Sequence, residues 1–405
     1  MFLSNKNIAL NFFYAIHLVG IFQFAGIKEN FIKAALLFLA LLIILTNLRN
    51  LRFRKHFIFL YLGLFLILLS AKSFKDLVEY SPPIVFLLVS IHLNSIFEKM
   101  DARIIPVVLR NLLVLSLIAT VLKLFIFGID ESYLVGFMTM TAGELGLIFP
   151  AFMLVFYFYN YKDFKKIRWV ILYLFLFGIV NEKRSIVFIF PILFFILGQI
   201  NLKRGLLYLS FLYPLAITLI PSLNRDEKIF GSIDLVYPFI YASDYVMADY
   251  GSKLQGSMVE AYNDQNVQLG RVTLFLNIFG DLKQLNIKTT LFGSGLGRYT
   301  NKYNSTVGIA DNLFSDYGYR GNLSSLLQVT LESGLLSIIC IIIFIYAQLR
   351  YYLKGRIFYA ILFIYAYDIL FYGQTCLKIL PISLYIVTLI PLSYDSNRTE
   401  NKSIY

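Results

Sequence analysis

Long apolar runs separated by short polar stretches dominate the chain of 405 residues. About twelve of these runs have the hydropathy of membrane spans, and several are shorter than the roughly 17–25 residues that cross a bilayer. We therefore expect the ends of the short spans to extend into flanking polar residues. The predicted spans cover residues 8–27, 31–48, 57–71, 82–97, 106–128, 142–160, 169–181, 185–200, 205–221, 334–349, 357–372 and 379–393.

One long polar region, residues 222–333, interrupts this pattern after the ninth span. It carries nine basic and eleven acidic residues. The chain divides accordingly into spans 1–9 (residues 1–221), the polar region, and spans 10–12 with a tail (residues 334–405). We predict an all-α, polytopic integral membrane bundle with one large, partly helical outer loop between spans 9 and 10.

The long polar region contains three recognisable parts. Residues 271–285 have apolar positions at helical spacing and predict a helix that lies along the membrane surface. Residues 293–319 are rich in Gly, Asn, Ser, Asp and Tyr, which is typical of a loop. Residues 323–349 predict one continuous helix that enters the membrane near Gly334.

The amino-acid composition indicates that lipid, rather than water, surrounds most of this chain. Hydrophobic residues make up 59% of the sequence and charged residues only 15%, against about 25% charged in average soluble domains. A soluble fold cannot hide so much apolar surface.

The distribution of basic residues orients the predicted spans. With the N-terminus inside, the inner loops hold nineteen Lys and Arg residues, and the short outer loops hold eight. This positive-inside bias places both termini in the cytoplasm and the long polar region outside. The net charge of +12 is thus a topology signal, and we expect bilayer lipids rather than nucleic acid as partners.

Arginines at the outer side are the first candidates for chemistry. Arg184 lies in a turn between two apolar runs, and Arg271 starts the surface helix. Arg298 follows a glycine run, and Arg320 lies just before the last predicted helix of the polar region. Guanidinium groups bind phosphate oxygens with two parallel hydrogen bonds. Arginines at an interface also simply reach lipid headgroups, which is the alternative role for each.

A glycine run next to Arg298 supports the same hypothesis. Gly293, Gly295 and Gly297 alternate with Ser294 and Leu296. Such a run exposes backbone N–H groups and permits close approach of an anion. The arginines and glycines together predict a site for a phosphate-bearing lipid at the outer interface.

Carboxylates near the outer side are candidates for a general base on a sugar hydroxyl. Solvated carboxylates or ion pairs with arginine are the alternative for each of them. Glu144 is the better candidate because it lies near the outer end of a predicted span. Asp311 and Glu332 are further candidates for the substrate site.

Metal and cofactor chemistry has no signature in this sequence. The three histidines, His17, His56 and His92, lie outside the long polar region, and the sequence holds no HExxH motif and no His/Cys cluster. We expect no metal site and no cofactor.

Four short stretches resemble the bacterial O-antigen polymerase and O-antigen ligase superfamily. Asn181–Ser185 resembles the arginine turn between two middle spans, and Gly270-Arg271 resembles the start of the large loop. Leu291–Gly297 resembles the family's "l-x-G-x-G-x-G" stretch, and Leu326–Leu335 resembles its "yLqxlxExGl" stretch. The span count and the late outer loop agree with this resemblance.

The resemblance implies metal-independent glycosyl transfer at the outer leaflet of the bacterial cytoplasmic (inner) membrane. The donor would be an oligosaccharide carried on undecaprenyl diphosphate, and the product an O-antigen, capsular or exopolysaccharide chain. A chain-length regulator is a further expected partner. The ligase branch has a histidine before the last stretch, whereas this chain has Arg320–Ser325 there, which favours the polymerase branch. Ligation to another acceptor and non-enzymatic flipping of the lipid-linked oligosaccharide are the alternatives.

Overall fold

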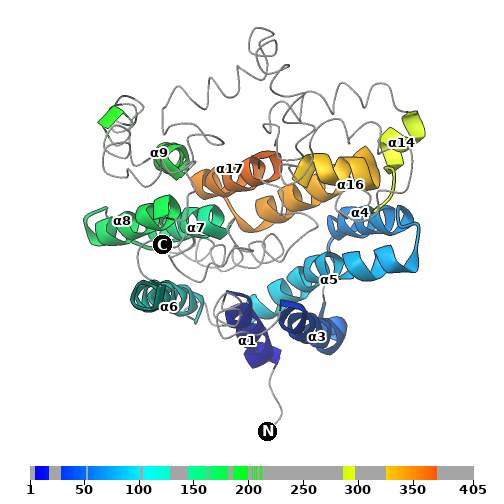
Figure 1. Cartoon of the computed structure of the whole chain (residues 1–405), viewed down its shortest axis with the longest axis horizontal. Coiled ribbons are helices and arrows are strands. Elements are labelled where there is room, and N and C mark those ends of the chain that lie inside the picture. The colour runs from blue at the N-terminus through cyan, green and yellow to red at the C-terminus, as the bar shows by residue number, and fades with distance from the viewer. Residues whose placement is uncertain are drawn as a thin grey trace, which may run out of the picture.

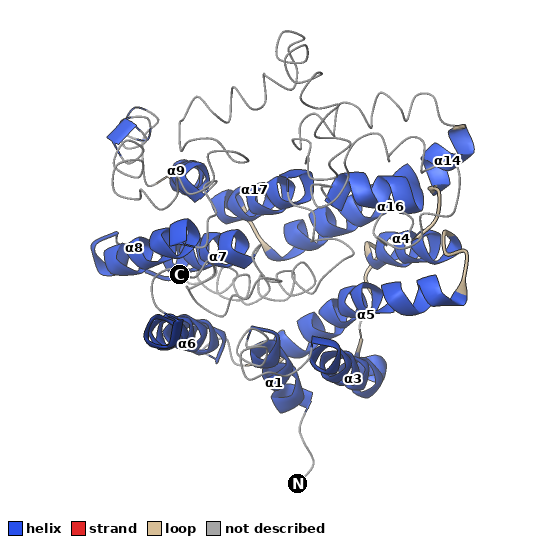
Figure 2. Ribbon diagram, viewed as in Figure 1, coloured by secondary structure: helices blue, strands red, loops and turns tan. Residues whose placement is uncertain are grey.

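The computed structural model describes residues 5–17, 29–51, 53–100, 104–127, 145–161, 164–180, 186–198, 286–296 and 325–371, with single positions 203, 205, 207, 210 and 211. All regular secondary structure in this part of the chain is helical (Figure 1, Figure 2). The helices are α1 (Asn5–His17), α3 (Glu29–Asn47), α4 (Phe57–Leu69), α5 (Phe74–Phe97), α6 (Ile104–Phe127), α7 (Leu145–Tyr161), α8 (Phe164–Val180), α9 (Ile186–Ile196), α14 (Ile287–Phe292), α16 (Ser325–Tyr352) and α17 (Gly355–Phe371), with a 3₁₀ turn, η1, at Leu48–Asn50.

The predicted all-α class is confirmed for the described residues. Ten of the twelve predicted spans overlap a helix: α1, α3 to α9, α16 or α17. The other two, residues 205–221 and 379–393, lie outside the described residues apart from single positions. The predicted surface helix at residues 271–285 also lies outside them.

Among the described residues, one helical segment is long and apolar enough to cross a membrane. It is Thr330–Tyr352 of α16, with 23 residues. Six shorter apolar segments of 10–17 residues lie in other helices, and α4, for example, has 13 residues. Such a helix is about 20 Å long, against a hydrocarbon core of about 30 Å. The number of spans therefore stays a prediction.

Large apolar side chains cover the outward faces of several helices. Phe38 of α3, Phe65 of α4 and Phe125 of α6 are exposed, and Phe125 keeps 85% of its surface. Exposed phenylalanines on three helices are typical of a chain whose outward faces contact lipid. These faces are the surface that lipid would cover.

Helices α4 and α16 form an antiparallel pair. His56, just before α4, contacts Gln348 near the end of α16, and Gly63 in the middle of α4 faces Cys340. A Cβ atom added to Gly63 would lie 3.2 Å from the Cys340 Cβ atom. Glycine therefore lets the two helices approach closely, as small residues do in membrane bundles.

The prediction of one continuous helix over residues 323–349 is wrong in one respect. Helix α16 is broken at Gly334, whose φ of 83° and ψ of 165° are not helical. The neighbouring chain explains the break, because a Cβ atom on Gly334 would lie 2.2 Å from the Leu291 carbonyl oxygen of α14. Backbone from the long polar region thus approaches α16 at this position, which only glycine permits.

Candidate functional site

Three stretches that are far apart in the sequence meet where α4 ends and α16 is broken. They are Ser70–Lys72 after α4, Gly293–Leu296 after α14, and Leu331–Gly334 within α16. We call this set the loop–helix junction. It contains three of the site residues predicted from the sequence: Gly293, Gly295 and Glu332.

The local sequence brings the glycine run to the junction. Asn286 caps α14, since its side chain accepts a hydrogen bond from the Lys288 N–H at 3.1 Å. Gly293 ends the helix with a φ of 80°, and its N–H donates to the Thr289 carbonyl at 2.8 Å. The chain then turns towards α16, beside which α14 lies in Figure 1.

Hydrogen bonds from this turn satisfy carbonyls at two helix ends. The Ser294 N–H and hydroxyl donate to Leu331 O at 2.9 and 2.8 Å, and the Gly295 N–H donates to Glu332 O at 3.0 Å. The Leu296 N–H donates to Ser70 O at 3.2 Å, at the end of α4. Carbonyls at helix ends and breaks lack helical partners, so these bonds stabilise the junction.

The N–H groups of residues 293–296 are therefore all engaged with backbone carbonyls. The sequence predicted that the amides of Gly293 and Gly295 bind an anion. An anion at these two residues would have to displace hydrogen bonds within the protein. In the described arrangement, this part of the glycine run holds a loop on a helix.

Glu332 is fully buried, with no exposed surface. A general base has to reach the hydroxyl of its substrate. An acceptor hydroxyl would reach this carboxylate only if the surrounding chain moved, and the substrate role of Glu332 stays a prediction. Lys72 packs on the glycine run, since a Cβ atom on Gly295 would be 2.9 Å from Lys72 Cε.

Sequence reasoning missed three members of the junction. Ser70 and Lys72 contribute through backbone and alkyl contacts with a segment more than two hundred residues away, which no local pattern signals. Gly334 follows Glu332 in a stretch that reads as helix. The remaining predicted residues lie outside the described residues: Glu144, Arg184, Arg271, Gly297, Arg298, Asp311 and Arg320.

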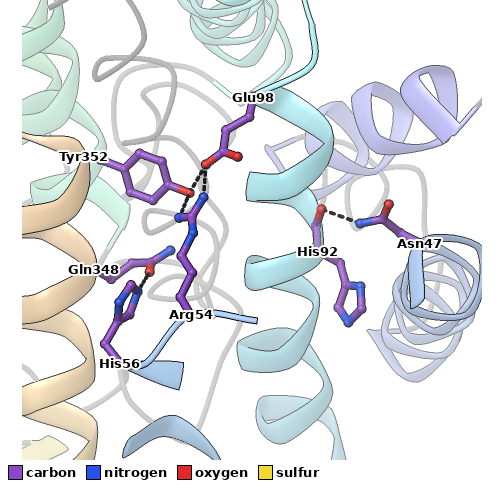
Figure 3. Close-up of polar contacts among 7 residues, drawn as sticks. All are labelled: Asn47, Arg54, His56, His92, Glu98, Gln348 and Tyr352. Atoms are coloured by element: carbon purple, nitrogen blue, oxygen red, sulfur yellow. Dashed lines mark hydrogen bonds and ion pairs between the residues drawn. The ribbon is translucent and has the colours of Figure 1, made fainter. Parts of the chain in front are cut away.

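A second polar cluster lies at the opposite end of the α4–α16 pair (Figure 3). Arg54 pairs with Glu98 and donates to Tyr352, and the Tyr352 hydroxyl donates to Glu98 Oε1 at 2.5 Å. The His56 Nε2–H donates to Gln348 Oε1 at 2.5 Å. These contacts join the segment before α4 to the ends of α5 and α16, and no motif in the sequence indicated them.

Electrostatics explain the charge states in this cluster. Burial opposes the charge of Arg54, but the contacts with Glu98 and Tyr352 raise its pKa above the ordinary value. Burial lowers the pKa of His56, and the Arg54 charge lowers it further, while the bond to Gln348 acts in the opposite direction. Arg54 is therefore charged and His56 neutral near pH 7, and the cluster stabilises the contact between helices.

The described residues contain no group of three or more His, Cys, Asp and Glu residues that could hold a metal ion. Comparison of the chain with protein-family models, with curated proteins and with solved structures finds no match. Assignment of a function therefore depends on the residues themselves.

Proposed function

We propose that the chain polymerises lipid-linked oligosaccharide repeat units into an O-antigen, capsular or exopolysaccharide chain. The observation that carries this proposal is the order of the four family-like stretches along the sequence. Its structural support is that two of them, Leu291–Gly297 and Leu326–Leu335, hydrogen-bond to each other in the loop–helix junction. A motif pair that meets in space is a better basis for function than either motif alone.

The proposed location is the bacterial cytoplasmic membrane, crossed about twelve times, with both termini in the cytoplasm. The exposed apolar faces of α3, α4 and α6 support a lipid environment. Sidedness is supported by α4 and α16, because Arg54, Glu98 and Tyr352 gather at one end of this pair and the loop–helix junction lies at the other. The first end carries loops predicted to be cytoplasmic, and the second carries loops predicted to be outside.

The proposed reaction transfers a glycan from undecaprenyl diphosphate to the sugar of a second lipid-linked unit. A hydroxyl oxygen of the acceptor sugar attacks the anomeric carbon of the donor, and the bond from that carbon to the diphosphate oxygen breaks. The diphosphate leaves with the electron pair of that bond, and the hydroxyl proton passes to a general base, for which Glu144 is the candidate. Arg184 and Arg271 stabilise the charge that grows on the diphosphate, with Arg298, Arg320 and Asp311 as further substrate contacts.

The experiment is the surface-glycan pattern of a strain that lacks the gene, with and without a plasmid copy. We expect the deletion strain to carry single repeat units on the final acceptor, and the plasmid copy to restore a ladder. Polymer that stays unattached would instead identify a ligase. Lipid-linked repeat units that remain on the cytoplasmic side would identify a flippase.

A further inference from the structure

We propose that Gly293 and Gly334 form a backbone-to-backbone joint that positions the long polar region on the helix bundle. In this inference, which rests on the proposed polymerase function, both glycines are positioning residues for glycosyl transfer. Neither glycine contacts substrate in the proposal.

The first argument is reciprocal close approach. A Cβ atom on Gly293 would lie 2.3 Å from Glu332 O and 2.6 Å from Gly334 N. A Cβ atom on Gly334 would lie 2.2 Å from Leu291 O and 2.5 Å from Phe292 N. All four atoms belong to the backbone, so no side-chain rotation can relieve the collision. Each glycine is thus required by the segment that carries the other.

The second argument is backbone conformation. Gly293 has a φ of 80° and ψ of 172°, and Gly334 has a φ of 83° and ψ of 165°. This region of backbone space is essentially restricted to glycine. Gly293 and Gly334 both adopt this conformation and lie directly opposite each other. The surrounding hydrogen bonds must hold them in this arrangement.

The third argument concerns what the joint controls. Leu296 is buried and bonded to Ser70, so the chain leaves the junction from a fixed point. Arg298 follows two residues later, and covalent geometry keeps its Cα atom within about 7 Å of the Leu296 Cα atom. The joint therefore fixes the position from which the segment with Arg298, a predicted substrate-binding residue, begins.

The α4–α16 pair has contacts that do not depend on the joint. Gly63 packs on Cys340, and His56 bonds to Gln348 at the far end. Loss of the joint should release the loop and leave the helices paired. This separates a positioning role from a role in global stability.

A cysteine reporter tests the joint directly. Ser333 is fully buried beside Gly334, and its hydroxyl has no hydrogen-bond partner, so Ser333→Cys loses no bond. In a background with Cys340→Ser and Cys376→Ser, we expect maleimide to label Cys at position 333 slowly. Adding Gly293→Ala or Gly334→Ala should accelerate labelling at least tenfold.

Gly355→Ala is the matched control. Gly355 also has a positive φ, 59°, but a Cβ atom there would meet nothing within 4 Å. Gly355→Ala therefore places a side chain at a positive-φ position without the collision, and labelling should stay at the parent rate. If maleimide labels Cys at position 333 at the parent rate in both the Gly293→Ala and Gly334→Ala variants, the proposed joint is overturned.

A turnover measurement tests the positioning role. With purified protein and lipid-linked repeat units, we expect Gly293→Ala and Gly334→Ala to lower kcat per folded molecule about 10²-fold, as a misplacement of about 1 Å can do. The Gly355→Ala variant should keep the parent kcat. Equal kcat per folded molecule in all variants would show a purely structural role and overturn the inference. If the parent itself makes no polymer, the proposed function falls with the catalytic part of the inference, and the labelling rates still decide whether the joint exists.

Discussion

Arg54 and Glu98 form an ion pair that joins the segment before α4 to the end of α5, forty-four positions further along the chain. The Arg54 guanidinium carbon also lies 4.0 Å from the centre of the Tyr351 ring. Guanidinium groups stack on aromatic faces while their N–H groups donate in the ring plane. Arg54 thus connects α4, α5 and α16 at one end of the bundle.

We expect Glu98→Gln to destabilise the protein by about 1–2 kcal/mol. Hydrogen bonds to charged groups contribute about 1.5–3 kcal/mol, and partial solvent screening reduces this value. The two side chains are 16% and 29% exposed, so the pair is only partly screened. Chemical unfolding of the detergent-purified protein measures the effect.

A double-mutant cycle separates the pair from its surroundings. Arg54→Met and Glu98→Gln should show a coupling free energy of about 0.5–3 kcal/mol. Arg49→Ala provides a control, since Arg49 is an exposed arginine close by in sequence. Strict additivity of the two changes would contradict a direct interaction.

His56 should make the stability of the protein depend on pH. Burial lowers its pKa in the folded state below the unfolded value of about 6.5. Between the two pKa values the unfolded chain binds more protons, so stability falls as the pH decreases below about 6.5. As the pH falls from 7.5 to 5.5, the stability of His56→Gln should therefore rise relative to that of the wild type. The measurement is thermal unfolding of both proteins across this pH range. Parallel curves of stability against pH would argue against a lowered pKa of His56.

Gly63 sets the distance between α4 and α16. Gly63→Ala should be tolerated with a small loss, because its Cβ atom would meet Cys340 Cβ at 3.2 Å and Ile341 Cγ1 at 3.3 Å. Gly63→Leu should cost about 1–3 kcal/mol or more, since added methylene groups force packed helices apart. Heating followed by size-exclusion chromatography reports both effects. Cys340→Gly removes the contacting Cβ atom, so in a double-mutant cycle it should couple favourably with Gly63→Ala, and strict additivity would place the strain elsewhere.

Hydropathy predicted helices well because long apolar segments satisfy their backbone hydrogen bonds internally. The predicted run at 106–128 and helix α6 at Ile104–Phe127 differ by two residues at the start and one at the end. Of the loop predicted for residues 293–319, only 293–296 are described, and there the chain is not helical because Gly293, with a positive φ, ends α14. Helix α14 itself was not predicted.

Local sequence patterns could not predict the loop–helix junction, for a physical reason. A glycine in a helical stretch costs about 1 kcal/mol, so Gly334 alone did not predict a break. The break depends on the Leu291 carbonyl and on N–H groups of Ser294 and Gly295, which lie some forty residues earlier. Contacts at this separation are fixed by packing and not by propensity. The predicted roles of Arg184 and Arg271 stay predictions because both residues lie outside the described residues.

Those two arginines give the sharpest test of the proposed chemistry. Transfer from a diphosphate requires stabilisation of the negative charge on the leaving group, and the sequence offers arginines for this task at the outer side. Arg184→Ala and Arg271→Ala should abolish long chains, because loss of one positioned donor raises the barrier by about 2.7–4 kcal/mol, or roughly 10²–10³ in rate. Arg→Lys keeps the charge but loses the two-pronged geometry, and should leave a weak, shortened ladder.

The measurement is a glycan ladder gel beside an immunoblot of the membrane fraction. All four variants should accumulate like wild type, because the proposal gives Arg184 and Arg271 a substrate contact and no packing role. Arg49→Ala is again the control, because Arg49 is an exposed arginine on the predicted cytoplasmic side, and its ladder should be normal. Normal ladders from both Arg184→Ala and Arg271→Ala at normal protein levels would move the diphosphate site to Arg298 and Arg320. Because Arg298 follows Leu296 so closely, that outcome would make the loop–helix junction the nearest fixed structure to the reacting diphosphate.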